Sequence, residues 1–162
     1  MKTFTDRPRE VRALFNPAFC GLVIARGIDG FSSVSGRPMP FSLSLLILPL
    51  CLHQHTREVF KAATRSYFTK ILEDHPEIRV GFAERTTGLF PYTMEAFAYL
   101  ATCGAVEIDD AGSITLVQGR VRRAISGTED SRDCQNVARS LGRKFAQLGD
   151  RVTIYTSLGI RP

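Results

Sequence analysis

Thiol and imidazole groups occur close together at Cys51, His53 and His55, and these are side chains that hold zinc in proteins. On a β-strand this spacing of two would place all three on one face, whereas on a helix it points them apart. No second Cys/His cluster follows, and His75 lies well away in the sequence. We therefore interpret the run as a polar helix end and predict no metal or other cofactor.

The adjacent carboxylates Asp109 and Asp110 are a second candidate, because paired acids serve metal-dependent nucleases. They precede Gly112 in a segment typical of a hairpin turn, where aspartate is expected for turn geometry alone. The chain has no Gly-x-x-x-x-Gly-Lys-Ser/Thr loop, and its Ser, His and Asp residues show no triad spacing. We predict no catalytic residues and no enzymatic activity, and a small hydrolase or nuclease remains an alternative.

Guanidinium groups are concentrated towards the C-terminal end of the chain. Of the net charge of +5, residues 1–117 contribute nothing, whereas residues 118–162 hold 9 basic against 4 acidic residues. Arginine favours bidentate contacts with carboxylate or phosphate, so the segment predicts a surface for an acidic protein or the DNA backbone. A solvated basic face that aids solubility is the plain alternative. The residues of this predicted surface are Arg120, Arg122, Arg123, Arg132, Arg139, Arg143 and Lys144.

The composition of the 162 residues is that of an ordinary globular protein, with 44% hydrophobic and 23% charged residues. We expect a single domain over residues 1–162 that begins with a flexible tail over residues 1–9. The N-terminal sequence has no signal-peptide pattern, and the most apolar run, Phe41 to Leu52, is too short to span a membrane. Cys20 and Cys51 lie among apolar neighbours, as buried free thiols do, so we predict a cytoplasmic protein without membrane contact.

The first half of the chain predicts helices that would form most of the core. Asn16 and Pro17 are typical of a helix start, and the apolar residues that follow extend the helix to about Ile28. Glycine and serine then indicate a loop over Gly30 to Gly36. Three more helices are expected: a central helix over Phe41 to His53 that is kinked at Pro49, one capped by Thr56, and one over Arg65 to Asp74.

The middle of the chain has the local order of a winged helix–turn–helix. Pro76 can open a helix, Pro91 is expected to break it, and Thr93 can cap a second helix. Residues 105–117 then alternate apolar and polar side chains around a turn, which predicts a β-hairpin. We therefore expect a winged-helix-like core over residues 76–117.

A long helix is expected at the C-terminal end, over residues 128–148, because Thr128 or Ser131 can cap it and Gly149 can end it. Its apolar side chains recur at helical spacing, and the apolar tail from Val152 onward is expected to dock on the core. The predicted fold class is mainly α with a small β-hairpin, a winged helix–turn–helix-like single domain with a long C-terminal helix.

The second helix of the predicted winged-helix core, Thr93 to Cys103, has one acidic residue and no basic residue. Such a helix repels phosphate, so it is unsuited to reading DNA. Its Met94, Phe97 and Tyr99 are typical anchors of protein interfaces, although amphipathic patterning alone also favours a core position for Phe97. A stand-alone winged-helix DNA-binding regulator remains the alternative function.

Several sequence blocks in order resemble the middle component of bacterial three-component ABC-ATPase systems, a group akin to the Lamassu anti-phage systems. The resemblance extends from Phe15 to the last residue. Its blocks are Asn16-Pro17, Pro40-Phe41, Leu48-Pro49-Leu50, Thr56-Arg57-Glu58, Glu77-Ile78-Arg79-Val80-Gly81-Phe82-Ala83-Glu84-Arg85, Leu141-Gly142-Arg143 and Thr153-Ile154-Tyr155 through Arg161-Pro162.

The resemblance implies a small accessory subunit of an antiviral defence system. Its expected partners are an ABC ATPase of the SMC or RecF type and a separate effector protein, and it brings no catalytic residues with it. We therefore expect an adaptor that bridges ATPase and effector and contacts the DNA backbone nonspecifically through its arginines.

Overall fold

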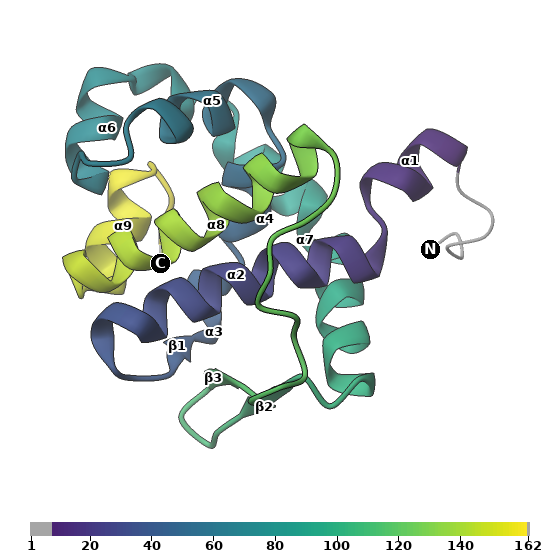
Figure 1. Cartoon of the computed structure of the whole chain (residues 1–162). Helices are drawn as coiled ribbons and strands as arrows, with labels where there is room; N and C mark the ends of the chain where they lie inside the picture. Colours follow the sequence, from purple (N-terminus) through teal and green to yellow (C-terminus); the bar gives the residue numbers. More distant parts are fainter. Residues whose placement is uncertain (1–7, 162) are drawn as a thin grey trace.

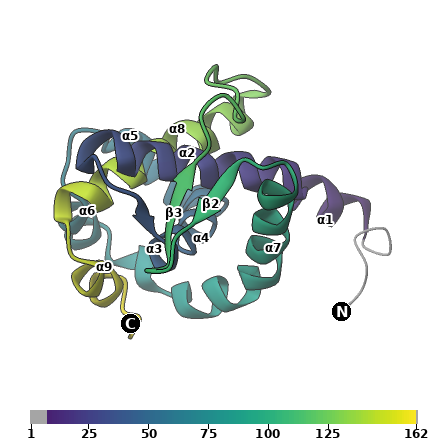
Figure 2. The same ribbon diagram turned by 90° about the horizontal axis from the view of Figure 1, so that it is seen from below.

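A computed structural model of the chain describes residues 8–161. Two long helices, α2 (Pro17–Ser35) and α8 (Glu129–Leu148), lie side by side at its centre (Figure 1). The other helices and a small sheet surround this pair (Figure 2). The described part of the chain is therefore mainly helical with one small antiparallel sheet. This confirms the predicted mainly α class.

Helix α2 begins where the sequence predicts and ends later. Asn16 accepts a hydrogen bond from the backbone N–H of Ala18, and Gly36 closes the helix in the left-handed conformation (φ 64°). The loop predicted over Gly30 to Gly36 is wrong, because residues 30–35 continue the helix and only Gly36 leaves it. Packing overrides the weak helix propensity of this segment: a Cβ at Gly30 would lie 2.1 Å from the carbonyl oxygen of Arg139 in α8.

Helix α1 (Arg9–Leu14) precedes α2. Most of the predicted flexible tail, residues 1–7, lies outside the described residues, and Arg9 belongs to α1. The stretch Val11–Ser35, which includes the end of α1 and all of α2, is long and apolar enough to cross a membrane. The core helix of a globular protein has the same character, and ten residues of α2 are buried by the elements around it.

Four short helices follow: α3 (Phe41–Ser44), α4 (Ile47–Cys51), α5 (Gln54–Ala62) and α6 (Phe68–Asp74). The single kinked helix predicted over Phe41 to His53 is wrong, since the chain breaks between α3 and α4. Pro49 lies in the first turn of α4, where a missing backbone N–H breaks no helical bond. His53, rather than Thr56, caps α5.

The predicted break at Pro91 is also wrong, because α7 (Phe82–Thr102) is one continuous helix that contains this proline. Pro76 opens only a short 3-10 helix, η2 (Pro76–Arg79). Figure 2 shows α7 as a curved helix, as a proline inside a helix produces. Phe82 on one side of the proline and Leu100 on the other are both buried in the core, which holds the helix together across it. The winged-helix assignment is therefore not confirmed.

The predicted hairpin is confirmed as β2 (Val106–Ile108) and β3 (Ser113–Leu116). A strand absent from the prediction, β1 (Met39–Pro40), pairs with the other side of β3, so the sheet order is β1-β3-β2. Met39 and Ile114 lie opposite each other, and both are fully buried. The sheet thus ties the segment that follows α2 to the hairpin.

The C-terminal helix α8 is confirmed together with its predicted ends. Thr128 accepts a hydrogen bond from the N–H of Ser131, and Gly149 ends the helix with φ 75°. Asp150 caps the short helix α9 (Arg151–Ser157), whose Ile154 is buried, so the tail docks as predicted.

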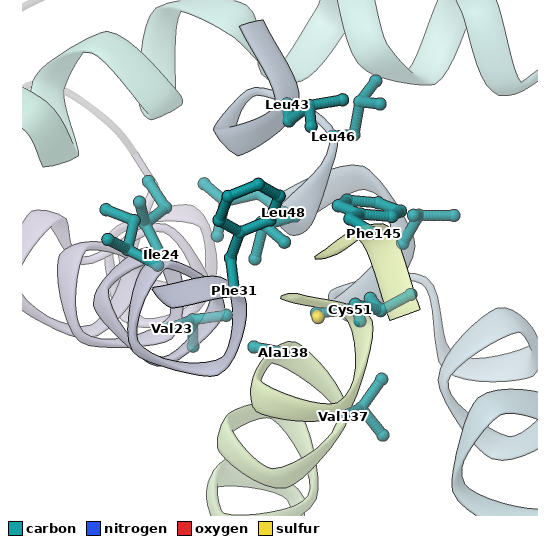
Figure 3. Packing of buried hydrophobic residues seen from close by; sticks show 14 of the residues in the cluster. Val23, Ile24, Phe31, Leu43, Leu46, Leu48, Cys51, Val137, Ala138 and Phe145 are labelled. Carbon is teal, nitrogen blue, oxygen red and sulfur yellow. The ribbon is translucent and has the colours of Figure 1, made fainter. Parts of the chain in front are cut away.

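The buried apolar residues form one cluster that extends from α2 to the end of α9. Figure 3 shows Ile24 and Phe31 of α2 facing this cluster with Leu48 of α4 and Phe145 of α8. Phe68 contacts the ring of Phe145 edge to face, with 5.2 Å between centroids. This core fixes α2 against α8 and so positions the charged side chains that these two helices present to solvent.

Candidate interaction surfaces

A surface hollow of about 430 Å³ opens between α2, α8 and the connector that follows β3. Three of the predicted basic residues line it: Arg123 from the connector and Arg139 and Arg143 from α8. The two α8 residues are one helical turn apart, so their side chains leave the same face of the helix. The fold therefore gathers these three arginines, which the sequence places up to 20 positions apart.

Asp29 of α2 also lines the hollow and pairs with Arg139. Both Nε and Nη2 of Arg139 donate to Oδ2 of Asp29, at 2.9 and 2.5 Å. Charge-assisted bonds of this kind hold the guanidinium plane in a defined orientation. The pair thus fixes Arg139 in the lining of the hollow, whereas Arg123 and Arg143 are exposed.

A fourth arginine in the hollow, Arg26, was missed by the sequence reasoning. It is only 3% exposed, and it donates to Oε1 of Gln135 (3.3 Å) and to the carbonyl oxygen of Ala124 (3.1 Å). Burial and the nearby Arg139 lower its pKa, while Asp29 opposes the shift. Its signal was present in the sequence: Arg26 is the one basic residue of the apolar helix Pro17–Ser35.

The other predicted basic residues take different positions. Arg120 and Arg122 are exposed on the connector, outside the lining of the hollow. Arg132 donates to the carbonyl oxygen of Gly127 near the start of α8.

Lys144 does not belong to a basic surface, because it is only 4% exposed. Its ammonium group donates to three carbonyl oxygens, those of Ala63, Thr64 and Ser66, which follow the end of α5. Burial lowers its pKa. Lys144 therefore ties α8 to the chain between α5 and α6. The sequence did not reveal this buried position, because Lys144 follows the exposed Arg143 directly.

The predicted protein-interface residues of α7 are divided between surface and core. Met94 and Tyr99 are exposed, by 39% and 45%. Phe97 is buried and packs on Phe41, with 4.9 Å between ring centroids, so it cannot anchor a partner. Met94 lies in an uncharged outward row of α7 whose members recur every three or four residues: Ala83, Thr87, Phe90, Met94, Ala98 and Ala101.

The candidate metal ligands are dispersed. Cys51 is buried, the Nδ1 of His53 caps α5, and His55 contacts Glu77 on the surface. Within residues 8–161 no group of three or more His, Cys, Asp or Glu side chains is arranged to hold a metal ion. Asp109 accepts from the N–H of Ser113 at 2.8 Å, which is the turn role expected for it.

The model of one protein family, ABC-three component (ABC-3C) system Middle Component 3, matches residues 4–162. Comparison with curated proteins and with solved structures returned no match. The match extends over almost the whole chain, and it agrees with the blocks that carry the sequence resemblance. This chain therefore belongs to the Middle Component 3 family of ABC-three component systems.

Proposed function

We propose that this chain is a non-catalytic adaptor that joins the ABC ATPase of its system, of the SMC or RecF type, to the effector. We place it in the cytoplasm, in antiviral defence. The observation that carries the proposal is the family match over residues 4–162, since a middle component works with the other components of its system. A small chain that exposes both an apolar helix row and a group of arginines suits a connecting role.

The outward row of α7 supports one of the two contacts. Phe90 and Met94 lie one turn apart on this row and are exposed by 48% and 39%. Large apolar side chains at the centre of an uncharged helix face are typical of helix-to-helix docking between proteins. We assign this row, flanked by Tyr99, to a protein partner within the system.

The arginines of α8 and the connector support the second contact. Arg122, Arg123 and Arg143 are exposed and can face an acidic protein surface or the DNA backbone. A contact with phosphates of this kind is independent of base sequence.

A stand-alone DNA-reading regulator is supported less well. Base edges are read by arginine, lysine, asparagine or glutamine side chains, and the outward row of α7 has none of these.

Co-purification with the products of the neighbouring genes tests the proposal. The chain should be retained by a tagged ATPase component or a tagged effector, and Phe90→Asp with Met94→Asp should lower retention by one partner at least tenfold. Val34→Asp is the matched control, because Val34 is an exposed apolar residue (47%) at the end of α2. A chain that no component retains, or that Val34→Asp weakens as much as the α7 changes, would contradict the proposal.

A further inference from the structure

The burial of Arg26 costs hydration free energy, because its guanidinium group is charged. The residue is only 3% exposed, on a helix whose other charged residue is Asp29, and a buried guanidinium requires strong compensation for its lost hydration. Within residues 8–161 its guanidinium donates two hydrogen bonds, both to neutral acceptors: the side-chain oxygen of Gln135 and the carbonyl oxygen of Ala124. Neither acceptor neutralises its charge.

A carboxylate on the same helix already pairs with another arginine. Asp29, one turn further along α2, receives both hydrogen bonds of Arg139 on a single oxygen. Asp29 is also the one acidic side chain among the described residues that line the hollow, against the guanidinium groups of Arg26, Arg123, Arg139 and Arg143. The hollow therefore carries an excess of three positive charges.

Such an excess is stabilised when an anion of two or more charges enters. Guanidinium groups are planar forks of N–H donors, and the oxygens of a phosphate group accept from several of them at once. The mutual repulsion of Arg26 and Arg139, which contributes to the lowered pKa of Arg26, would be relieved by the bound anion.

The size and lining of the hollow suit a small phosphorylated ligand. Its volume of about 430 Å³ falls in the range of small-molecule sites, roughly 300–1,000 Å³. Ala25, Leu116, Val117 and Val121 give it an apolar wall beside the arginines. A diester in duplex DNA carries one charge per phosphate and follows the outside of a surface, whereas a terminal phosphate can enter a recess with its oxygens free.

We propose that the hollow lined by Arg26, Arg123, Arg139 and Arg143 binds the terminal phosphate of a small phosphorylated molecule. Arg26 is the floor of the site, Arg139 is oriented by Asp29, and the exposed Arg123 and Arg143 close on the ligand from the connector and from α8. The proposal does not depend on the bridging role, because a small ligand can occupy the hollow in the isolated chain.

Isothermal titration calorimetry of the full chain with pyrophosphate tests the site, at an ionic strength held constant with NaCl and in a buffer without phosphate or sulfate. We expect saturable binding that is at least tenfold weaker in the double variant Arg123→Gln/Arg143→Gln. The matched control is Arg120→Gln/Arg122→Gln, which removes the same charge from the exposed connector outside the hollow. It should change the affinity less than twofold.

Absence of pyrophosphate binding overturns the proposal, and so does an equal loss in the two double variants, which would show diffuse charge attraction. Arg26→Gln should abolish pyrophosphate binding. If this variant fails to fold, the two double variants of exposed arginines still test the proposal.

In competition, ATP should displace pyrophosphate at lower phosphate concentration than a short DNA duplex does. The reverse order would make the DNA backbone the occupant and contradict a small-molecule site. Failure of this site is distinguishable from failure of the adaptor role, because pyrophosphate binding is measured on the isolated chain, whereas the adaptor role is measured by retention on the other components.

Discussion

Gly142 of α8 lies directly against the backbone of Gly27 in α2. A Cβ placed on Gly142 would be 1.9 Å from the carbonyl oxygen of Gly27, and a Cβ on Gly30 would be 2.1 Å from that of Arg139. The two central helices therefore touch backbone to backbone, with glycine on both sides of the contact. This close approach is what brings Arg26 of α2 within reach of Gln135 of α8.

Replacing Gly142 by alanine should separate α2 from α8 and lower the free energy of unfolding by at least about 2 kcal/mol. The added methyl group meets main chain, which cannot rotate away as a side chain can. Urea denaturation monitored by circular dichroism measures the change. The matched control is Gly88→Ala in α7, where none of the described residues beyond the local helix backbone lies within 4 Å of the added Cβ. It should stabilise the protein by up to about 1 kcal/mol through helix propensity, and equal effects of the two changes would refute the close contact.

Lys144→Met should destabilise the fold by about 2 kcal/mol, because the carbonyl oxygens of Ala63, Thr64 and Ser66 lose a charged donor in a buried place. Chemical denaturation is again the measurement. Lys70→Met is the control, since Lys70 forms an exposed pair with Asp74 one turn away, and it should leave stability unchanged. A Lys144→Met protein as stable as wild type would show that the ammonium group is dispensable there.

The four thiols should divide into one reactive and three unreactive groups. Cys103 is exposed, whereas Cys20, Cys51 and Cys134 are buried. Burial raises the pKa of all three, that of Cys20 to about 12, and the thiol form is a poor nucleophile. Titration with a disulfide reagent at pH 8 should therefore modify one thiol per chain quickly, and the remainder only in denaturant. Cys103→Ser should abolish the fast phase; a fast phase that survives this change would place a second thiol at the surface.

Protonation of His53 should weaken the start of α5. Its Nδ1 accepts the N–H of Thr56 at 3.4 Å, and desolvation, followed by the charges of Arg85, His55 and Arg57, lowers its pKa below 6.5. Because the pKa of His53 is lower in the folded state than in the unfolded state, its contribution to stability is fully present at a pH above the unfolded-state pKa. That contribution is lost as the pH falls from 6.5 through the folded-state pKa.

His53→Asn removes this titration and keeps a capping acceptor. The free energy of unfolding of wild type should therefore fall below that of the variant as the pH decreases from 7.5 to 5, in denaturant titrations at matched ionic strength. Parallel pH profiles for the two proteins would contradict a role for His53 protonation.

Much of the fold was accessible from local sequence patterns. Asn16 and Thr128 cap helices, Gly149 ends one, and the turn at Asp109 joins two strands, as their side chains and backbone freedom dictate. The family was accessible too, since ordered blocks of residues carry it. These features depend on residues within a few positions of each other, or on their order along the chain.

Other features required distant parts of the chain to meet. Pro91 lies within a continuous helix because the core holds both of its ends, and Gly30 is helical because α8 passes over it. The burial of Lys144 and Phe97, and the meeting of Arg26 with Arg123 and Arg139, follow from the packing of α2 against α8 and the connector. Local propensity decides where helices can begin and end, but burial and close contact between distant segments decide which residues face solvent.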